Sequence, residues 1–487
     1  MHFRFDNTYA SLPSEFFAPA APSPVKNPQL IAFNESLAED LGIDCEQADT
    51  ESIARICSGN VVPEGAQPLA MAYSGHQFGG FSPQLGDGRA ILLGEVIDKS
   101  GNRRDIQWKG AGPTPFSRRG DGRSALGPVL REYVVSEAMH ALGIPTTRAL
   151  AAVSTGENVY RETVEPGGVF TRVAQSHLRI GTVQFFAARQ DIENLKVLVK
   201  YALNRHYPEA IDSENPALAL LNGVMNRQAN LVAKWMNAGF IHGVMNTDNM
   251  SLSGETIDYG PCAFMDHYDP ARKFSFIDRG GRYAFANQPA IAHWNLTRLA
   301  EALLPLLAEK EEQSIELAEA ELSKLPSLFE PLYMETFCRK IGLPRSSEDS
   351  WALADSFLDL LRDRKVDFTL AYRRLTEVLE AGSNGLLELF SDPEPVSRWL
   401  DDWKQTLGKL HIPNKQAIQL MREANPVYIP RNHKIEELIE AGKEGDFSLF
   451  HRMNEVVAKP FESREKFSEY ELAPEPHEVV PATFCGT

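Results

Sequence analysis

The spacing of hydrophobic positions changes character along the chain. Residues 71–127 combine many glycines with short β-type runs, whereas beyond about residue 191 leucine and alanine recur at helical intervals. This change predicts a sheet-rich front half and a helical back half. Residues 18–28 are rich in proline and alanine and predict an extended N-terminal arm. The proline-rich tail, residues 474–487, is predicted to be loosely held.

A β-hairpin and a glycine-rich loop are predicted within the front half. Residues 89–97 favour a strand, residues 98–102 are turn residues, and residues 105–109 favour a second strand. Residues 110–127 then form a loop rich in glycine and arginine.

Helices are predicted where apolar residues return every three or four positions. The first follows the glycine-rich loop and ends at Gly143 and Pro145. A second covers residues 229–238 and is capped by Gly239, and more continue through about residue 407. The residues that mark the first helix and one of the later helices are Val135, Ala138, Met139, Leu142, Leu296, Leu299, Ala300, Leu303 and Leu307.

Composition and charge restrict the class of protein. A chain of 487 residues with 43% hydrophobic and 24% charged residues is typical of a globular protein with more than one domain-sized unit. The net charge of -17 argues against general nucleic-acid binding, because an acidic surface repels phosphates. The sequence has no apolar run of about 18 residues and no leader-like N-terminus, which predicts a cytoplasmic protein without a membrane partner.

Gly86 and Gly88 stand just before the first strand of the predicted hairpin, and Arg89 follows them. Glycines allow backbone N–H groups to approach phosphate oxygens because no Cβ intervenes. A glycine pair before a strand is also typical of an ordinary turn. The motif is therefore a candidate phosphate loop that needs support from elsewhere in the chain.

Lys109 and Glu132 form a candidate ion pair. Strand alternation places Lys109 on the face opposite to Ile106 and Trp108, and Glu132 lies on the apolar stripe of its own helix. An inward carboxylate needs a counter-charge, and a fixed Lys–Glu pair is how protein kinases hold nucleotide phosphates. The alternatives are a solvated strand lysine and an acid that favours the helix dipole.

The loop at residues 240–249 resembles a protein-kinase catalytic loop, and Asp258-Tyr259-Gly260 resembles the metal motif that follows it. When Asn249 is aligned with the kinase asparagine, Val244 takes the place of the catalytic base. Valine cannot accept a proton. The pattern therefore indicates a kinase scaffold without the usual base.

Asn249 and Asp258 retain the oxygen ligands that Mg²⁺ prefers when substrate phosphates complete its coordination. Asp248, adjacent to Asn249, is the nearest carboxylate that could act as a base in place of the missing one. The alternative role for Asp248 is to cap the loop.

These residues, together with the motifs at 74–79, 118–124 and 425–426, resemble the selenoprotein O family of protein adenylyltransferases over nearly the whole chain. The resemblance implies a pseudokinase that binds ATP in a flipped orientation and transfers AMP to protein Ser, Thr or Tyr hydroxyls, releasing pyrophosphate. It implies Mg²⁺ as the ion, with Mn²⁺ and UTP as alternatives for a uridylyl transfer.

The resemblance also implies roles for individual residues. Asn249 and Asp258 correspond to the metal ligands and Asp248 to the proton acceptor. Lys109 and Glu132 are expected to take part in catalysis as the kinase-type ion pair derived above. The residues that correspond to nucleotide-binding positions are Gly86, Gly88, Arg89, Lys109, Asp121, Gly122, Arg172, Arg179 and Asp258.

The expected fold class is α+β, a protein-kinase-like two-lobed fold with an N-terminal extension and added C-terminal helices. The expected units are an extension over 1–70, an N-lobe over 71–185 and a helical C-lobe over 186–487. Two other functions remain open at this stage: a kinase that transfers the γ-phosphoryl group, and a scaffold that binds nucleotide without catalysis.

The cysteines are scattered without paired spacing, so the sequence predicts neither a zinc knuckle nor a disulfide framework. Many members of the resembled family carry a selenocysteine or cysteine near the C-terminus, and Cys485 stands there in this chain. A disulfide from Cys485 to residues 273–276 has no cysteine to receive it, and Cys262 near Asp258 is the alternative.

Overall fold

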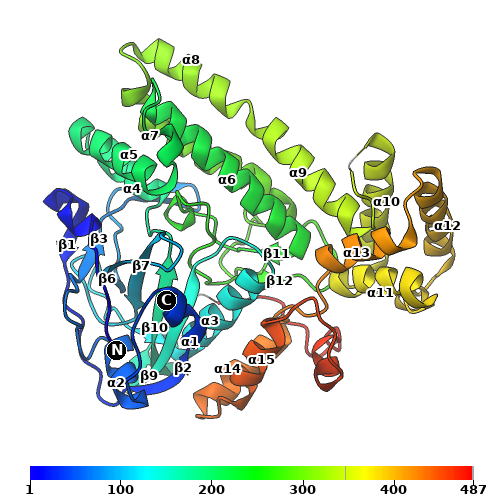
Figure 1. Cartoon of the computed structure of the whole chain (residues 1–487), viewed down its shortest axis with the longest axis horizontal. Coiled ribbons are helices and arrows are strands. Elements are labelled where there is room, and N and C mark those ends of the chain that lie inside the picture. The colour runs from blue at the N-terminus through cyan, green and yellow to red at the C-terminus, as the bar shows by residue number, and fades with distance from the viewer. Residues whose placement is uncertain (346, 485–487) are drawn as a thin grey trace.

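An antiparallel sheet forms one side of the molecule and helices form the rest (Figure 1). The structure is a computed structural model that describes residues 1–345 and 347–484. The predicted α+β class is confirmed at the level of a mixed sheet-and-helix protein. Cys485 lies outside the described residues.

The main sheet has the strand order β1-β3-β6-β7-β10-β9-β2, with β8 paired to β10. A separate hairpin is made by β4 and β5, and another by β11 and β12. The strands are β1 (Phe17–Pro19), β2 (Gln29–Phe33), β3 (Leu69–Met71), β4 (Gly75–Gln77), β5 (Gly80–Ser82), β6 (Ala90–Ile97), β7 (Arg103–Lys109), β8 (Ser124–Ala125), β9 (Arg148–Tyr160), β10 (Val164–Ala174), β11 (Phe240–Ile241) and β12 (Ala263–Phe264).

The predicted hairpin is confirmed as β6 and β7, which pair in antiparallel register. Two features of the sheet were not predicted. The long strands β9 and β10 form a second hairpin beside β7. The strands β1 and β2 stand at the two ends of the predicted arm, and they take the two ends of the strand order.

Each face of the sheet is covered by different elements, and this decides which way β7 side chains point. Trp108 is fully buried in a cluster that includes Leu37 of helix α1 (Glu35–Asp40). Successive side chains of a strand point to opposite faces. Lys109 therefore faces the other layer, where helix α3 (Leu126–Ala141) packs on β9 and β10.

Helix α6 (Pro216–Ala238) shows how the sequence sets helix ends. Asn215 caps its start by accepting a hydrogen bond from the Leu218 amide, and Gly239 ends it with φ of 70°. The prediction covered only residues 229–238. The helix begins earlier, and Gly223 within it leaves room for the Tyr207 ring, which would lie 2.7 Å from an added Cβ.

The remaining helices cover the rest of the molecule. Helices α6 and α7 lie beside one another, α8 and α9 follow each other along a line next to them, and α10 to α13 are grouped at the opposite end from the sheet (Figure 1). Helix formation continues to Val457, well beyond the predicted limit near residue 407. The helices not yet bounded are α2 (Thr50–Cys57), α4 (Ile180–Ala187), α5 (Ile192–His206), α7 (Gln288–Leu307), α8 (Glu311–Leu322), α9 (Leu325–Lys340), α10 (Glu348–Arg364), α11 (Phe368–Ala381), α12 (Glu394–Lys409), α13 (Asn414–Ala424), α14 (Asn432–Lys443) and α15 (Ser448–Val457).

The described part of the C-terminal tail is held against the body, in contrast to the prediction of a loose tail. Thr483 forms a parallel bridge with Ser275, and its amide donates to the Phe274 carbonyl at 2.8 Å. Arg131 of α3 donates to the Phe484 carbonyl at 2.8 Å. These hydrogen bonds outweigh the low propensity of a proline-rich segment for regular structure.

Within the described residues, none of the helices combines the length and apolar character needed to cross a bilayer.

Candidate active site

Lys109, Glu132 and Asp258 meet between the sheet and the helical part of the molecule. The Lys109 Nζ lies 2.7 Å from Glu132 Oε2 and 2.8 Å from Asp258 Oδ1. The predicted Lys–Glu pair is therefore present, and Glu132 is 3% exposed. Because both carboxylates share one ammonium group, the lysine is held rigidly at the end of β7.

Two arginines complete a cluster of positive charge around Asp258. Arg172 of β10 lies 2.6 Å from Asp258 Oδ1 and 3.2 Å from Glu132 Oε1. Arg179, which precedes α4, lies 3.7 Å from Asp258 Oδ2. Both arginine side chains are only 1% exposed. Three cations thus converge on a single carboxylate in a protein whose net charge is -17.

The position and charge state of Asp258 are both unusual. Its backbone has φ of 61°, a left-handed conformation that is uncommon for a residue other than glycine. Although burial alone would raise the pKa of this carboxyl, the surrounding cations, Arg172 foremost, hold it well below the usual range. Asp258 is therefore an anion locked in place by its neighbours.

A second layer orients the arginines, and none of its residues was singled out from the sequence. Gln107 Oε1 accepts from Arg172 Nε at 2.8 Å, and Gln107 Nε2 donates to Asp87 Oδ2 at 3.0 Å. Asp87 Oδ1 lies 3.5 Å from Arg179 Nη1. The signal for Gln107 was available, because it lies two positions before Lys109 on the same strand and so shares its face.

Asp248 and Asn249 lie on the short 3-10 helix η4 (Thr247–Asn249) between β11 and β12. Burial raises the pKa of the Asp248 carboxyl to about 6, although a hydrogen bond from Gln77 opposes the shift. Asn249 Nδ2 donates to the carbonyl of Val244 at 3.0 Å. The charges of Arg179 and Asp258 also act on Asp248, so the loop belongs to the same electrostatic site.

The predicted phosphate loop adjoins the cluster through Arg89. Gly86 has φ of 74°, and a Cβ there would lie 2.3 Å from the Phe116 ring, so only glycine fits. A pocket beside the ion pair is lined by Arg89, Lys109, Glu132 and other residues, namely Ser124, Pro128, Val129, Phe170, Tyr259 and Gly260. Arg89 is half-buried and has no ion-pair partner within residues 1–345 and 347–484.

Asp121 and Gly122 lie in the second glycine loop, and no contact of theirs with the cluster is seen in the described part of the chain. Asp121 pairs instead with Arg161 at 2.8 Å and is 46% exposed. A Cβ on Gly122 would lie 2.0 Å from the Gly112 carbonyl oxygen, so this glycine allows two loop segments to touch. A nucleotide-binding role for these two residues stays a prediction.

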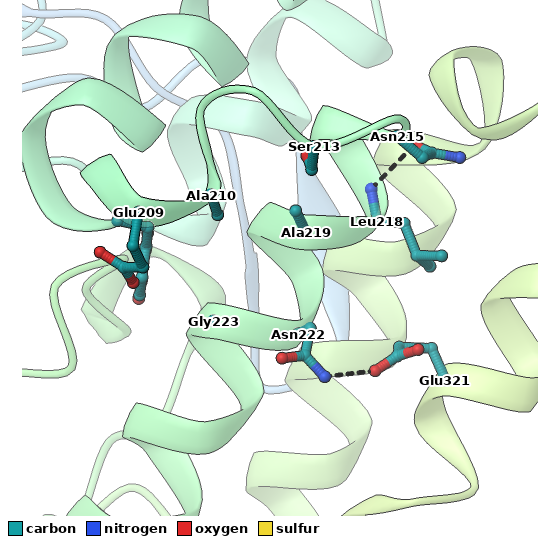
Figure 2. A pocket seen from close by; sticks show the side chains of 10 residues that line it. Glu209, Ala210, Ser213, Asn215, Leu218, Ala219, Asn222, Gly223 and Glu321 are labelled. Carbon is teal, nitrogen blue, oxygen red and sulfur yellow. Dashed lines mark hydrogen bonds between the residues drawn. The ribbon is translucent and has the colours of Figure 1, made fainter.

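Another pocket lies between α6 and α8 and shares no residue with the cluster (Figure 2). Its one acidic side chain on α8 is already paired, since Asn222 Nδ2 donates to Glu321 Oε1 at 2.5 Å and Lys324, outside the lining, neutralises the same carboxylate at 2.7 Å. The arrangement has no counterpart to the convergent cations around Asp258. The chemistry of the molecule is therefore assigned to the cluster.

Comparison with known proteins gives matches along the full length of the chain. The family model described as protein adenylyltransferase SelO matches residues 1–458. The chain is 55% identical to the protein nucleotidyltransferase YdiU of Rhizobium etli (strain CIAT 652), with 100% of this chain and 97% of that protein covered. It is 56% identical to the YdiU nucleotidyltransferase of Agrobacterium fabrum, with 99% and 100% covered.

Proposed function

This chain belongs to the SelO family of protein adenylyltransferases, and on that premise we propose that it transfers AMP from ATP to protein hydroxyls with the residues around Asp258. As a family member it is a nucleotidyltransferase. The proposed acceptors are Ser, Thr and Tyr side chains of other proteins, and the product released is pyrophosphate.

The observation that carries the proposal is the convergence of Lys109, Arg172 and Arg179 on Asp258. Glu132 and Asp87 also contact these cations, so the charges of the cluster balance, and the support for a polyanion is the number of N–H donors that converge at one place. The most deeply buried cations are the two arginines, each 1% exposed. Buried arginines bind phosphates strongly, because their planar donors meet phosphate oxygens in pairs and water does not screen them.

This distribution of charge supports a nucleotide that enters with its terminal phosphates inward. The β- and γ-phosphates would then contact Arg172 and Arg179, and the α-phosphate would lie near Asp258 and Asn249. Leaving-group charge grows on the pyrophosphate in the transition state, where fixed cations are most effective. In this proposal the nucleotide is flanked on the sheet side by Gly86, Gly88 and Arg89. At a greater distance from Asp258 it contacts Asp121 and Gly122.

The same reasoning supports a protein-kinase-like arrangement of two lobes. The chain carries first a strand lysine paired to a helix glutamate, Lys109 and Glu132, and later Asn249 and Asp258 between β11 and β12. This is the order expected for that fold. In this proposal residues 1–70 are an N-terminal extension, 71–185 form the N-lobe, and 186–487 form the C-lobe with its additional helices.

Asn249 and Asp258 would hold the Mg²⁺ ion, with Mn²⁺ as the alternative. The Nδ2 group of Asn249 is fixed by the Val244 carbonyl, which leaves its Oδ1 available as a ligand. Among the described residues no group of three or more His, Cys, Asp or Glu side chains could hold a metal. Because Mg²⁺ is usually bound by one or two protein oxygens together with substrate phosphates, the phosphates would complete the coordination. When bound, the ion supplies further positive charge at the reacting phosphate.

Asp248 is the proposed general base. As the acceptor oxygen forms its bond to the α-phosphorus, its proton passes to the Asp248 carboxylate, and the bond from that phosphorus to pyrophosphate breaks. A pKa raised by burial suits a group that must accept a proton near neutral pH. Val244, aligned with the usual kinase base, cannot perform this step.

The first prediction separates the proposed reaction from its alternatives. The protein incubated with magnesium, an acceptor protein and ATP labelled at the α-phosphate should place label on the acceptor, whereas γ-labelled ATP should release labelled pyrophosphate only. Protein-bound radioactivity after gel electrophoresis measures the result. Transfer of the γ-label would establish a kinase, and no transfer from either nucleotide would establish a binding-only protein.

The second prediction concerns Asp248. Asp248→Asn should lower kcat for AMP transfer by about 10²-fold, the usual contribution of a general base, while ATP affinity changes little. Steady-state transfer rates and ATP titrations measure the two quantities. The exposed Asp212 offers a matched control, because Asp212→Asn makes the same chemical change outside the site. An unchanged kcat in Asp248→Asn would remove Asp248 from the mechanism.

A further inference from the structure

The hairpin formed by β4 and β5 is fastened onto the loop that carries Asp248. The His76 amide donates to Thr247 Oγ1 at 2.7 Å, and the Phe78 amide donates to Asn246 Oδ1 at 3.1 Å. Between these two anchors, Gln77 Nε2 donates to Asp248 Oδ2 at 3.1 Å. Consecutive hairpin residues thus bind consecutive residues of the catalytic loop.

Aromatic contacts hold the hairpin rigid at its outer side. The ring of Phe78 packs edge-on against Tyr283 at 5.2 Å between centroids. The His76 ring meets Trp294 of α7 at 5.3 Å and Phe81 at 4.9 Å. The backbone at Gln77 is therefore held by the contacts of its two neighbours, His76 and Phe78.

The two oxygens of Asp248 have different surroundings. Oδ2 accepts the hydrogen bond from Gln77, whereas Oδ1 is buried and has no hydrogen-bond partner among the described residues. Gly75 borders Oδ1 closely, since an added Cβ there would lie 2.6 Å from it. A buried carboxylate oxygen without a partner is costly, because it loses its water and gains nothing in exchange. The carboxylate therefore depends on its other oxygen, Oδ2, for the hydrogen bond that fixes its orientation.

We propose that Gln77 is a positioning residue for AMP transfer, which holds the Asp248 carboxylate through Oδ2 in the orientation that allows it to accept the proton of the acceptor hydroxyl. The inference rests on the proposed role of Asp248 as base. Without the amide donor, the carboxylate is able to rotate about its Cβ–Cγ bond, and the productive orientation loses population. Gln77 would then affect the transfer step and leave nucleotide binding unchanged, because no contact of Gln77 with Lys109, Arg172 or Arg179 is seen in the described parts of the chain.

The test measures kcat and both KM values for Gln77→Leu with ATP and an acceptor protein. We expect kcat to fall by about 10-fold to 10²-fold, with the KM for ATP unchanged within about twofold, as for loss of an interaction that matters in the transition state. Gln84→Leu is the matched control, because this exposed glutamine follows the same hairpin and binds Arg189 at 2.7 Å.

A double-mutant cycle shows whether Gln77 acts through Asp248. In an Asp248→Asn background, Gln77→Leu should lower kcat no further, because the carboxylate that Gln77 orients is already absent. Thermal unfolding midpoints establish that each variant is folded, and Gln77→Met, with a side chain of similar length, replaces Gln77→Leu if that variant is unstable.

Two outcomes would overturn the inference: a wild-type kcat in the Gln77 variants, or a full additional loss in the Asp248→Asn background. These outcomes can be distinguished from a failure of the proposed function itself. If the proposed function were wrong, Asp248→Asn would keep full activity, or the wild-type protein would transfer no α-label.

Discussion

Asp258→Asn should reduce AMP transfer by more than about 10³-fold, because it removes a proposed metal ligand and the anion that organises the cations of the site. Lys109 and Arg172 both lie within 2.8 Å of Asp258 Oδ1. Without the negative charge they repel one another and leave the positions in which they would receive phosphates. Incorporation of α-label into an acceptor protein measures the loss.

The same variant should also lose stability, by about 3 kcal/mol, because the buried cations lose one of their carboxylate partners. ATP added without divalent metal should then raise the unfolding midpoint of Asp258→Asn more than that of the wild-type protein, since phosphates replace the missing charge. Asp367→Asn is a suitable control. Asp367 is 5% exposed and paired with the buried Arg431, so its loss removes a buried anion that has no ion pair with the cations of the cluster in the described part of the chain. Retained transfer in Asp258→Asn would refute the assigned site.

Arg172→Met and Arg179→Met should each lower AMP transfer by about 10³-fold, the scale on which an arginine stabilises charge in phosphoryl transfer. Arg172→Lys should recover only part of the loss. A lysine keeps the positive charge, but it cannot make the several directed hydrogen bonds by which Arg172 contacts Gln107 and Glu132 and, in the proposal, phosphate. Transfer rates at saturating ATP and ATP affinities from titration measure both effects.

Removing any buried arginine disturbs packing, so a control with equal burial is required. Arg205 has a side chain that is 4% exposed and pairs with Glu95 and Asp105, outside the cluster. Arg205→Met should lower the unfolding midpoint as much as Arg172→Met does, yet keep the transfer rate of the folded protein. If both variants lose transfer equally, the effect of Arg172 is on folding and not on the reaction.

The Lys109–Glu132 pair shows why part of this site could be predicted. Strand alternation places Lys109 opposite Trp108, and helical spacing places Glu132 on an apolar stripe. Both are local periodicities, so neighbouring residues suffice to determine them. The loop at 240–249 was also predictable, because its residues are contiguous and Val244 visibly stands where a base would be needed.

Other parts of the site depend on strand pairing that local patterns do not determine. Arg172 lies opposite Gln107 because β10 pairs with β7 in one particular register. A shift by one residue would turn every side chain of the strand to the other face. The long hairpin of β9 and β10 was not predicted, so the sequence pattern alone offered no reason to place Arg172 in the site.

By itself, the sequence determined the β6–β7 hairpin, the inward lysine and glutamate, and the valine at position 244 where a kinase carries its base. It also led to the proposal of Asn249 and Asp258 as metal ligands. Only the tertiary structure decided that Arg172 and Arg179 converge on Asp258 and that Gln77 holds Asp248. The physical reason is distance along the chain. Arg172 and Asp258 are 86 residues apart, and Gln77 and Asp248 are 171 apart. Such contacts form only when the whole sheet and the catalytic loop are packed together.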